Sequence, residues 1–493
     1  MSRVSTGSAG RDALAARVDG GGLSPTARRV HFVGVGGIGM SGIAEMMSVL
    51  GYEVSGSDVT ASSVTARLRD LGISIETGHD ARWVGDAEAV VISAAVPDDN
   101  PEVVEARRRR LPVILRGAML AGLARTSSTI AITGTHGKST TSSMTAVILA
   151  DCGLDPTAVI GARVGAFGSN VRVGRGPHFV LEADESEPSL LELSPRIAVL
   201  TNLEEEHLEQ YGTFARLRQT IITFANRVDE TGAVILCADD PELARLRHHL
   251  TRRVVTYGLD DTSADVVGDT PVLDAAGSSC HVRFGRESRR QTVRLAVGVP
   301  GRHNLLNALG AFAVGLEVGL DPALIAAALG RFGGIDRRFQ LKGVAAGVRV
   351  IDDYAHHPTE VAAVLATARC QPLVRLVAIF QPHRYSRTAR LGDAFAKVLA
   401  TADVVVLTDV FAAGEAPVPG VTSAHLAAAV RAATDGPVHC VRTLDDVVTL
   451  AVGLVRPGDL VLTLGAGSIG GVGDRLLEAL RYSDGAPDRP ETP

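Results

Sequence analysis

Short runs of β-branched residues alternate with longer segments rich in alanine and leucine along almost the whole chain. Runs of the first kind include TIAIT, FVLEA, IAVLT and LVLTLG, and each is followed by a segment in which a helix can form. This alternation is typical of strand–helix–strand units, in which a helix connects two parallel strands and covers one face of their sheet. The sequence therefore predicts an α/β fold with largely parallel sheets.

The chain has 493 residues, about three times the length of a typical domain. The order of strand and helix patterns predicts boundaries near residues 124 and 334, and the stretch 262–300 is typical of antiparallel hairpins. We expect a disordered segment at 1–26, a Rossmann-like domain at 27–124, a central domain of the phosphate-loop ATPase type at 125–333, a C-terminal Rossmann-like domain at 334–483 and a disordered tail at 484–493.

Composition argues against two classes of protein. The net charge is only −6, which does not suggest a nucleic-acid-binding protein, and the longest apolar stretches are far shorter than the ~20 residues of a membrane span. The five cysteines are scattered without a CxxC pair, which is typical of a reducing compartment. The N-terminus also lacks the pattern of a signal peptide. We expect a cytoplasmic monomer or weak homodimer that neither binds nucleic acid nor inserts into a membrane.

The first glycine-rich motif, GVGGIG at 34–39, lies between a predicted strand and a predicted helix. Its glycines would let a pyrophosphate approach backbone N–H groups at the N-terminus of the helix. Asp58, at the end of the next predicted strand, could accept a ribose hydroxyl. A nucleotide diphosphate, a nicotinamide or flavin cofactor, and a purely structural turn all fit this pattern. The candidate binding residues are Gly36, Gly37, Ile38, Gly39 and Asp58.

A second glycine-rich loop, TGTHGKST at 133–140, also follows an apolar strand and opens a predicted helix. It departs from the standard phosphate loop because Ile132 stands where a glycine is usual. Lys138 is one of only three lysines among the 49 basic residues, which suggests that a compact ammonium is needed there. Lys138 would contact the β and γ phosphates and Ser139 would bind Mg²⁺. The predicted ATP-binding residues of this loop are Gly134, Thr135, His136, Gly137, Lys138, Ser139 and Thr140.

Acidic residues end two of the strands that follow. The segment EADE at 182–185 begins with Glu182, and TNLEEEHLEQYG at 201–212 carries His207. Carboxylates beside a phosphate loop are costly without a cation, so Glu182 is a candidate metal ligand. A solvated loop would explain the same acids, and a single histidine is more often a surface or core residue than a ligand.

Taken together, these segments resemble the Mur ligase family over about residues 28–482. The segments that carry the resemblance occur in the family's order: VGVGGIGMSGIA, GTHGKST, EADESE, TNLEEEH, GRHNLLNALGA, RRF, DDYAHHPTE, QPHRYSRT and GAGSIG. GTHGKST is specific to the family as a whole, and VGVGGIGMSG, DDYAHHP and HRYSRT resemble its alanine-adding branch.

The resemblance implies an ATP-dependent ligase of peptidoglycan precursor synthesis that requires Mg²⁺. The lactyl carboxylate of UDP-N-acetylmuramate would attack the γ-phosphate of ATP and form an acyl phosphate. The amine of L-alanine would then attack this activated carbonyl, giving an amide, ADP and phosphate.

The resemblance also implies roles for individual residues. Lys138, Glu182 and His207 would be catalytic, and Ser139, Glu182 and His207 would bind metal. Further ATP contacts would come from Asn304, Asn307, Arg338 and Asp353. The incoming amino acid would be held by Tyr354, His383, Arg384 and Arg387. The first domain would bind the UDP sugar on Gly36 to Gly39, in place of a nicotinamide cofactor.

The chain departs from the family pattern at two positions, where Glu206 replaces a common aspartate and Ala355 a frequent glycine. Residues 208–230 contain no lysine, so the modified lysine of the sister ligases is not available, which agrees with the alanine-adding branch. Three alternatives remain open at this point. They are a ligase that attaches a whole tripeptide to the same sugar nucleotide, an NAD(P)-dependent dehydrogenase and a non-catalytic nucleotide-binding switch.

Overall fold

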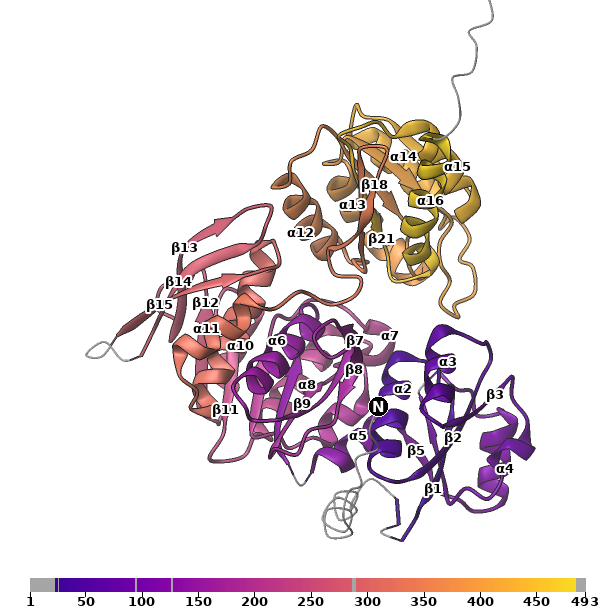
Figure 1. Ribbon diagram of the computed structural model, residues 1–493, viewed down its shortest axis with the longest axis vertical. Helices are drawn as coiled ribbons and strands as arrows, with labels where there is room; N and C mark the ends of the chain where they lie inside the picture. The colour runs from indigo at the N-terminus through magenta and orange to yellow at the C-terminus, as the bar shows by residue number, and fades with distance from the viewer. Residues whose placement is uncertain (1–22, 25, 94, 126, 286–289, 485–493) are drawn as a thin grey trace, which may run out of the picture. The chain divides into compact units, whose positions relative to one another are not determined.

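The computed structural model describes residues 23–484 except 25, 94, 126 and 286–289, and it contains three sheets (Figure 1). The predicted disordered ends, 1–26 and 484–493, lie almost wholly outside the described residues. The chain divides into two compact units. The first consists of Met1–Pro271, Cys280–Ala296 and Leu306–Gly333, and the second of Val272–Ser279, Val297–Leu305 and Gly334–Pro493.

The first sheet has five parallel strands in the order β3-β2-β1-β4-β5. The strands are β1 (Arg29–Val33), β2 (Glu53–Asp58), β3 (Ser74–Thr77), β4 (Ala89–Ile92) and β5 (Val113–Leu115). Its helices are α2 (Ile38–Val49), α3 (Ser63–Asp70), α4 (Pro101–Arg108) and α5 (Arg116–Ala124). The strand order reverses between β1 and β4, and ligands of doubly wound sheets bind at the carboxyl ends of the strands at such a point. The GVGGIG loop follows β1 and so lies at this switch point.

The second sheet has ten strands in the order β15-β14-β13-β12-β11-β10-β6-β9-β7-β8. The strands are β6 (Ser128–Thr133), β7 (Thr157–Val164), β8 (Ser169–Arg172), β9 (His178–Glu182), β10 (Ile197–Leu200), β11 (Ala233–Cys237), β12 (Val254–Gly258), β13 (Val266–Leu273), β14 (Ser278–Phe284) and β15 (Gln291–Val297). The accompanying helices are α6 (Lys138–Asp151), α7 (Leu208–Tyr211), α8 (Phe214–Asn226), α9 (Pro241–Leu246), α10 (Arg302–Val318) and α11 (Pro322–Gly330).

Strand β6 lies between β9 and β10 and is parallel to both. The carboxyl ends of parallel neighbours meet at one edge of a sheet. The loops that follow β6, β9 and β10 therefore converge, and they are the segments that carry GTHGKST, EADE and TNLEEEH.

The third sheet has the order β16-β17-β21-β18-β19-β20, parallel except for β16, which pairs antiparallel with β17. Its strands are β16 (Gln340–Ala345), β17 (Val348–Asp353), β18 (Leu376–Phe380), β19 (Val404–Leu407), β20 (Val438–Cys440) and β21 (Leu460–Leu464). Its helices are α12 (Pro358–Arg369), α13 (Tyr385–Leu399), α14 (Ser423–Ala433), α15 (Leu444–Leu454) and α16 (Val472–Asp484). Two buried apolar clusters complete this part of the chain.

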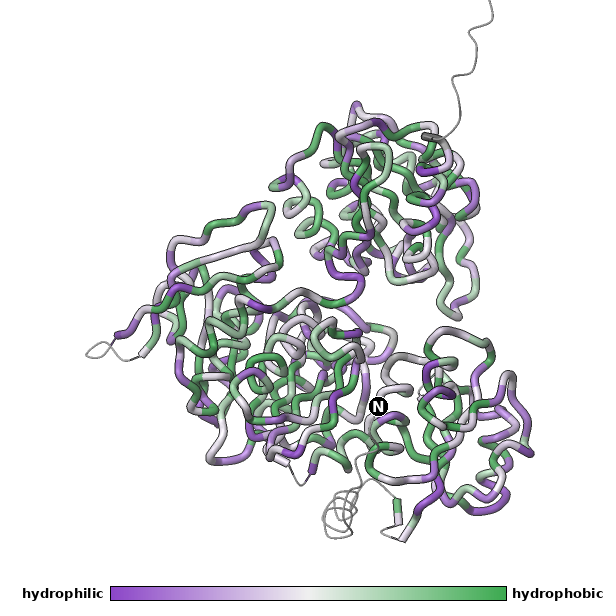
Figure 2. Tube along the Cα trace, viewed as in Figure 1, coloured by the Kyte–Doolittle hydropathy of each residue, from purple (hydrophilic) through white to green (hydrophobic). Residues whose placement is uncertain are grey.

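The α/β class and the largely parallel sheets are confirmed, and every strand predicted in the first and third blocks is present. The strands that the sequence did not indicate are β3, β5, β16 and β20 in the first and third sheets, and β7, β8 and β12 in the second. The first four and β8 lie at the edges of their sheets, where one side of the strand has no neighbour and a continuous apolar run is not needed. The inner strands β7 and β12 contain residues that are not fully buried. The inner strands β4, β10, β11 and β19 are buried at every residue. Figure 2 shows the hydropathy of each residue along the chain, with hydrophobic residues in green. Among the described residues, no helix is both long and apolar enough to cross a membrane.

Candidate functional site

The loop after β6 has a backbone that only glycine permits at two positions. Gly134 and Gly137 have φ values of +131° and +81°. A Cβ atom at Gly134 would lie 2.2 Å from Thr201 Oγ1, and one at Gly137 would lie 2.4 Å from Asn307 Oδ1. The loop after β10 also fixes this turn, because the Asn202 side chain bonds both the backbone N–H of His136 (2.8 Å) and its carbonyl (3.0 Å). The phosphate-loop shape is thus held by its neighbours.

Lys138 begins α6 and folds back into this loop. Its Nζ donates to the carbonyls of Gly134 (2.7 Å) and Thr135 (3.1 Å), and it forms an ion pair with Glu185 Oε2 at 2.8 Å. Burial lowers the pKa of Lys138, but the charges of Glu185 and Asp184 outweigh it and leave the pKa above its ordinary value. Lys138 is therefore positively charged and is fixed within the phosphate loop by these contacts.

Glu185 is the residue of this site that the sequence did not single out. Its side chain is 1% exposed, and besides Lys138 it faces His207, whose Nε2 lies 3.4 Å from Oε1. Tyr211 donates a hydrogen bond to the Glu185 carbonyl, and burial with the nearby carboxylates raises the pKa of Tyr211 to about 12. Burial raises the pKa of Asp184, but Lys138 and bonds from Ser186 outweigh this and leave the pKa below its usual range.

Ser139 and Glu182, two predicted metal ligands, are in contact. Ser139 Oγ donates to Glu182 Oε1 at 3.0 Å, and the other carboxylate oxygen accepts from the Gly161 N–H at 2.6 Å. Ligand atoms of Asp184, Glu185 and His207, the third predicted ligand, all lie within 4.8 Å of one another. A hydroxyl and several carboxylates at a phosphate loop form the oxygen-rich donor set that suits Mg²⁺.

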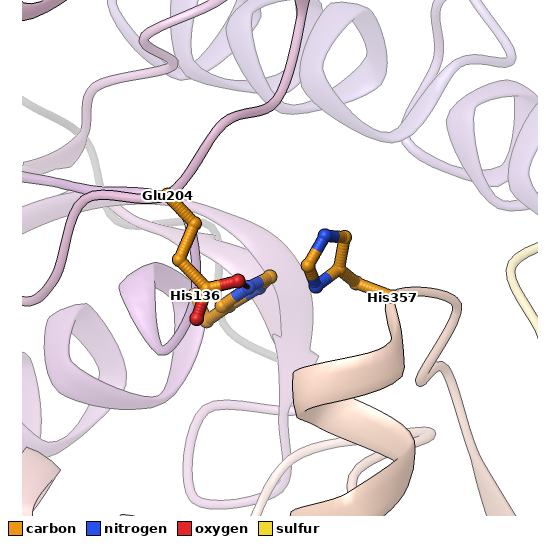
Figure 3. Close-up of side chains that lie close together, drawn as sticks. All are labelled: His136, Glu204 and His357. Carbon is orange, nitrogen blue, oxygen red and sulfur yellow. Dashed lines mark ion pairs between the residues drawn. The ribbon is translucent and has the colours of Figure 1, made fainter. Parts of the chain in front are cut away.

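The remaining predicted residues of this loop differ in their surroundings. His136 Nε2 lies 3.4 Å from Glu204 Oε2, and both side chains appear in Figure 3. His357, also drawn there, belongs to the second unit, where it accepts from the Thr359 N–H and caps α12. Thr140 is buried in the first turn of α6, and the next residue, Thr141, donates to Asn307 Oδ1 at 3.2 Å.

The glycine loop after β1 is closed by the residue predicted to bind a ribose. The Gly36 N–H donates to Asp58 Oδ2 at 2.8 Å, and a Cβ atom at Gly36 would lie 2.7 Å from that oxygen. Asp58 also accepts from the Thr60 N–H at 3.1 Å. Gly37 is the N-cap of α2, and Ile38 and Gly39 are the first two residues of the helix. Asp58 therefore shapes the loop, and its contact with a ribose stays a prediction.

In the second unit, Asp353 ends β17 as a buried carboxylate. It accepts the N–H groups of Phe339 and Ala355, both at 2.7 Å. Burial raises the pKa of Asp353 to about 6, against the opposing charge of Arg338. Arg338 lies over the Tyr354 ring, with its guanidinium carbon 5.3 Å from the centroid. Asn304 is buried in the first turn of α10 and donates to the Pro300 carbonyl at 2.7 Å.

The predicted amino-acid-binding residues lie around a row of rings in this unit. Tyr354, His356, His383 and Phe411 follow one another at centroid distances of 5.3, 5.7 and 5.5 Å. Arg387 Nη1 lies 3.1 Å from His383 Nδ1. His356 and Phe411 were not predicted; burial lowers the pKa of His356 to about 3, so its ring is neutral.

Arg384 is the N-cap of α13 and has a φ of +69°, which is rare for a residue other than glycine. Its N–H donates to the Phe411 carbonyl at 2.8 Å. Backbone strain of this kind persists where the surrounding structure fixes it, often at ligand sites. The N-cap of α13 is therefore an arginine and not one of the residues that usually cap a helix.

The structure thus brings the predicted residues together in two groups. Lys138, Ser139, Glu182 and His207 form one group in the first unit, with Asn307 beside the same loop. Tyr354, His383, Arg384 and Arg387 form another in the second unit, which also holds Asn304, Arg338 and Asp353. Glu185, His356 and Phe411 complete these groups. Glu185 and His356 had a signal in the sequence, because they belong to the segments EADE and DDYAHHPTE, whereas Phe411 belongs to none of the quoted segments.

Models of protein families match three successive parts of the chain. The Mur ligase family catalytic domain matches residues 29–128, the Mur ligase middle domain matches residues 132–315, and the Mur ligase glutamate ligase domain matches residues 337–467. Together they cover most of the chain.

Curated relatives are similar over nearly their whole length. A UDP-N-acetylmuramate–L-alanine ligase of Anaeromyxobacter dehalogenans is 49% identical over 453 residues, which are 92% of this chain and 98% of the relative. That of Halorhodospira halophila is 46% identical over 481 residues, 96% and 97% of the two chains. Among solved structures, the UDP-N-acetylmuramate–alanine ligase of Thermotoga maritima has a TM-score of 0.80 at 32% identity, covering 92% and 99%. A murein peptide ligase of Psychrobacter arcticus has a TM-score of 0.69 at 25% identity, with the same coverage.

Proposed function

The chain belongs to the Mur ligase family, and we propose that it joins the lactyl carboxylate of UDP-N-acetylmuramate to L-alanine, with conversion of ATP to ADP and phosphate, in peptidoglycan precursor synthesis. The observation that carries this proposal is Lys138, whose side chain is 15% exposed and paired with Glu185 in the phosphate loop, beside the contact between Ser139 and Glu182. Among solved structures, the identity is 32% with an L-alanine ligase and 25% with a murein peptide ligase, and curated L-alanine ligases are 46–49% identical, which favours L-alanine over a tripeptide.

The chemistry requires charge neutralisation at the phosphate loop. A carboxylate is a poor electrophile, and it reacts with an amine only after one oxygen has become a good leaving group. Lys138 would move from Glu185 to the β and γ phosphates and offset the charge that builds up during phosphoryl transfer. When bound, Mg²⁺ would supply Lewis-acid stabilisation of the same charge. Ser139, Glu182 and His207 are the residues proposed to hold it.

The row of rings in the second unit suits an amino acid. Arg384 and Arg387 would pair with the carboxylate of L-alanine, a group that arginine binds in bidentate fashion. The rings of Tyr354 and His383 would contact the apolar side chain. With its carboxylate neutralised in this way, the substrate keeps its amine available for attack on the acyl phosphate.

The first sheet is proposed to bind the UDP sugar. Backbone N–H groups of Gly36, Gly37, Ile38 and Gly39 at the start of α2 would receive the diphosphate. We further propose a UDP-sugar domain at 27–124, an ATP domain at 125–333 and an amino-acid domain at 334–483. ATP and UDP sugars are cytoplasmic metabolites, so the proposed location is the cytoplasm. The expectation of a monomer or weak homodimer stays a prediction.

An assay of phosphate release tests the proposal. The protein, Mg²⁺, ATP, UDP-N-acetylmuramate and L-alanine are combined, each component is then omitted in turn, and the product is identified by its mass. We expect release only in the complete mixture, with the mass of the sugar nucleotide plus one alanine residue. Release without the amine or the sugar nucleotide would contradict the proposal.

The same assay separates the alternatives. A preference for L-Ala-γ-D-Glu-diaminopimelate over L-alanine would favour the ligase that attaches a tripeptide. Calorimetry should show binding of the UDP sugar and no binding of NAD(P), which argues against a dehydrogenase. Turnover that depends on all substrates argues against a non-catalytic switch.

A further inference from the structure

Arg116, the first residue of α5, connects the first sheet to the carboxylate-bearing loop of the second. Strand β9 ends at Glu182, and we call residues 182–187 the carboxylate loop. Arg116 Nε donates to Glu187 Oε1 at 3.0 Å, and Nη2 bonds the same oxygen. The two side chains are 22% and 21% exposed, so the ion pair is largely shielded from water. The loop that it holds also carries Glu182 and Glu185.

The same guanidinium lies against the glycine loop of the first sheet. A Cβ atom at Gly39 would lie 2.0 Å from Arg116 Nη1, so the close approach depends on glycine at this position. The next residue of α5 is equally confined, because a Cβ atom at Gly117 would lie 1.7 Å from Ser189 Oγ and 2.8 Å from Glu187 Oε2. The start of α5 therefore lies against the glycine loop on one side and the carboxylate loop on the other.

We propose that Arg116 is a positioning residue that couples binding of the UDP sugar to binding of Mg²⁺ and ATP. This inference rests on the proposed function, because it takes the diphosphate to bind at Gly36–Gly39 and the metal nucleotide at Lys138. A diphosphate there competes with Glu187 for the guanidinium, which prefers phosphate and carboxylate partners. The carboxylate loop is then released, and Glu185 on it can release Lys138 to the triphosphate. Each ligand thereby favours binding of the other.

Calorimetry tests this coupling directly. The dissociation constant of a non-hydrolysable ATP analogue with Mg²⁺ is measured with and without saturating UDP-N-acetylmuramate. We expect the sugar nucleotide to tighten binding by about fivefold or more in the wild type, the lower end of ordinary coupling between sites. In Arg116→Met and in Glu187→Gln the ratio should fall to about one. The double variant should lose no more than either single variant, because both remove the same interaction.

Arg67→Met is the matched control. Arg67 Nη1 bonds Glu45 Oε2 at 2.5 Å and Ser169 Oγ at 3.3 Å, so it also connects the first sheet to the second, away from both loops. Its coupling ratio should equal that of the wild type. If Arg116→Met fails to fold, Glu187→Gln carries the test alone.

The possible outcomes distinguish a failure of the role of Arg116 from a failure of the proposed function. A wild-type protein that binds neither ligand would overturn the proposed function. A wild-type protein that binds both without coupling, or variants that keep the wild-type ratio, would overturn the role of Arg116 and leave the function standing. Loss of coupling in Arg67→Met as well would show that any disturbance of the contacts between the first and second sheets removes the coupling. That result would also overturn the role of Arg116.

Discussion

A lysine can stay charged inside a protein only when an anion lies close to it. The presence of Lys138 therefore implies a carboxylate partner, which is Glu185. The sequence identified Lys138 through its spacing from two glycines and its rarity. It placed Glu185 in an acidic segment without a partner, because the pairing depends on β6 and β9 being neighbours. Another buried carboxylate, Glu102, is bonded by His31, His79 and Ser57 and had no sequence signal at all.

Replacing Lys138 should remove the cation that stabilises phosphoryl transfer. We expect Lys138→Ala to lower turnover by about 10³-fold or more, or about 4 kcal/mol of barrier, the usual effect of losing one preorganised charge. Phosphate release under saturating substrates is the measurement. Lys397→Ala, which changes an exposed lysine on α13, is the control and should remain active. Near-normal turnover in Lys138→Ala would refute the assignment.

Replacing Arg384 should weaken binding of the amino acid. A lost charge-assisted hydrogen bond is worth about 1.5–3 kcal/mol, so we expect Arg384→Ala to raise the KM for L-alanine by about tenfold or more. The KM values for ATP and the UDP sugar should change little. Arg390→Ala, an exposed position further along α13, provides the control. An unchanged KM for L-alanine would remove Arg384 from the proposed site.

Asp353 should make the stability of the protein depend on pH in a direction opposite to most carboxylates. Its pKa is raised from 3.8 to about 6 by burial, so the folded protein binds more protons than the unfolded chain between these values. The stabilising contribution is therefore present below pH 4 and is lost as the pH rises through 6. It amounts to about 3 kcal/mol, from about 1.4 kcal/mol per pH unit.

Urea denaturation of the wild type and Asp353→Asn at several pH values between 4 and 7 measures this effect. The difference in unfolding free energy between the two proteins should change by about 3 kcal/mol over that range, in favour of the variant at higher pH. Asp393→Asn, on the exposed side of α13, controls for the loss of a charge. A difference that is constant with pH would contradict the raised pKa.

In the first and third sheets the inner strands were predictable and the edge strands were not, whereas in the second sheet the inner strands β7 and β12 were also missed. An inner strand such as β18 (Leu376–Phe380) is buried along its whole length, so its sequence is an unbroken apolar run. The edge strand β3 has the sequence SIET with one buried residue, and only its pairing with β2 makes it a strand. The site loops were predictable because they follow inner strands. Their contacts were not, because these depend on which strands are neighbours.

Helix α6 offers a matched pair of glycines at its two ends. Gly137 precedes the helix with φ +81°, and Gly153 follows it with φ +82°. A side chain at either position strains the backbone to a similar degree. Only at Gly137 would it also meet another residue, Asn307 Oδ1 at 2.4 Å, because nothing lies within 4 Å at Gly153.

We therefore expect Gly137→Ala to weaken binding of Mg²⁺–ATP by about tenfold or more, since a shift of the loop costs more than about 1.4 kcal/mol. Gly153→Ala should lose only about 1 kcal/mol of stability and keep its affinity. Calorimetry and thermal denaturation give the two quantities. Equal affinities in the two variants would show that the approach of Gly137 to Asn307 does not shape the nucleotide site.

At the scale of the whole molecule, the proposed boundary near residue 334 makes the third sheet an independent folding unit. All six strands lie within Gln340–Leu464, and both apolar clusters that cover the sheet consist of residues between 339 and 480. A segment that contains its own core satisfies the usual condition for folding alone. We expect a fragment of residues 334–484 to give a circular dichroism spectrum of an α/β protein and to unfold cooperatively on heating.

The control fragment, 334–456, lacks β21, which lies between β17 and β18 in the middle of the sheet, and it should not fold. If the longer fragment is also unfolded, then residues 272–279 and 297–305, which cluster with this unit, are part of its minimum structure and the boundary at 334 is wrong.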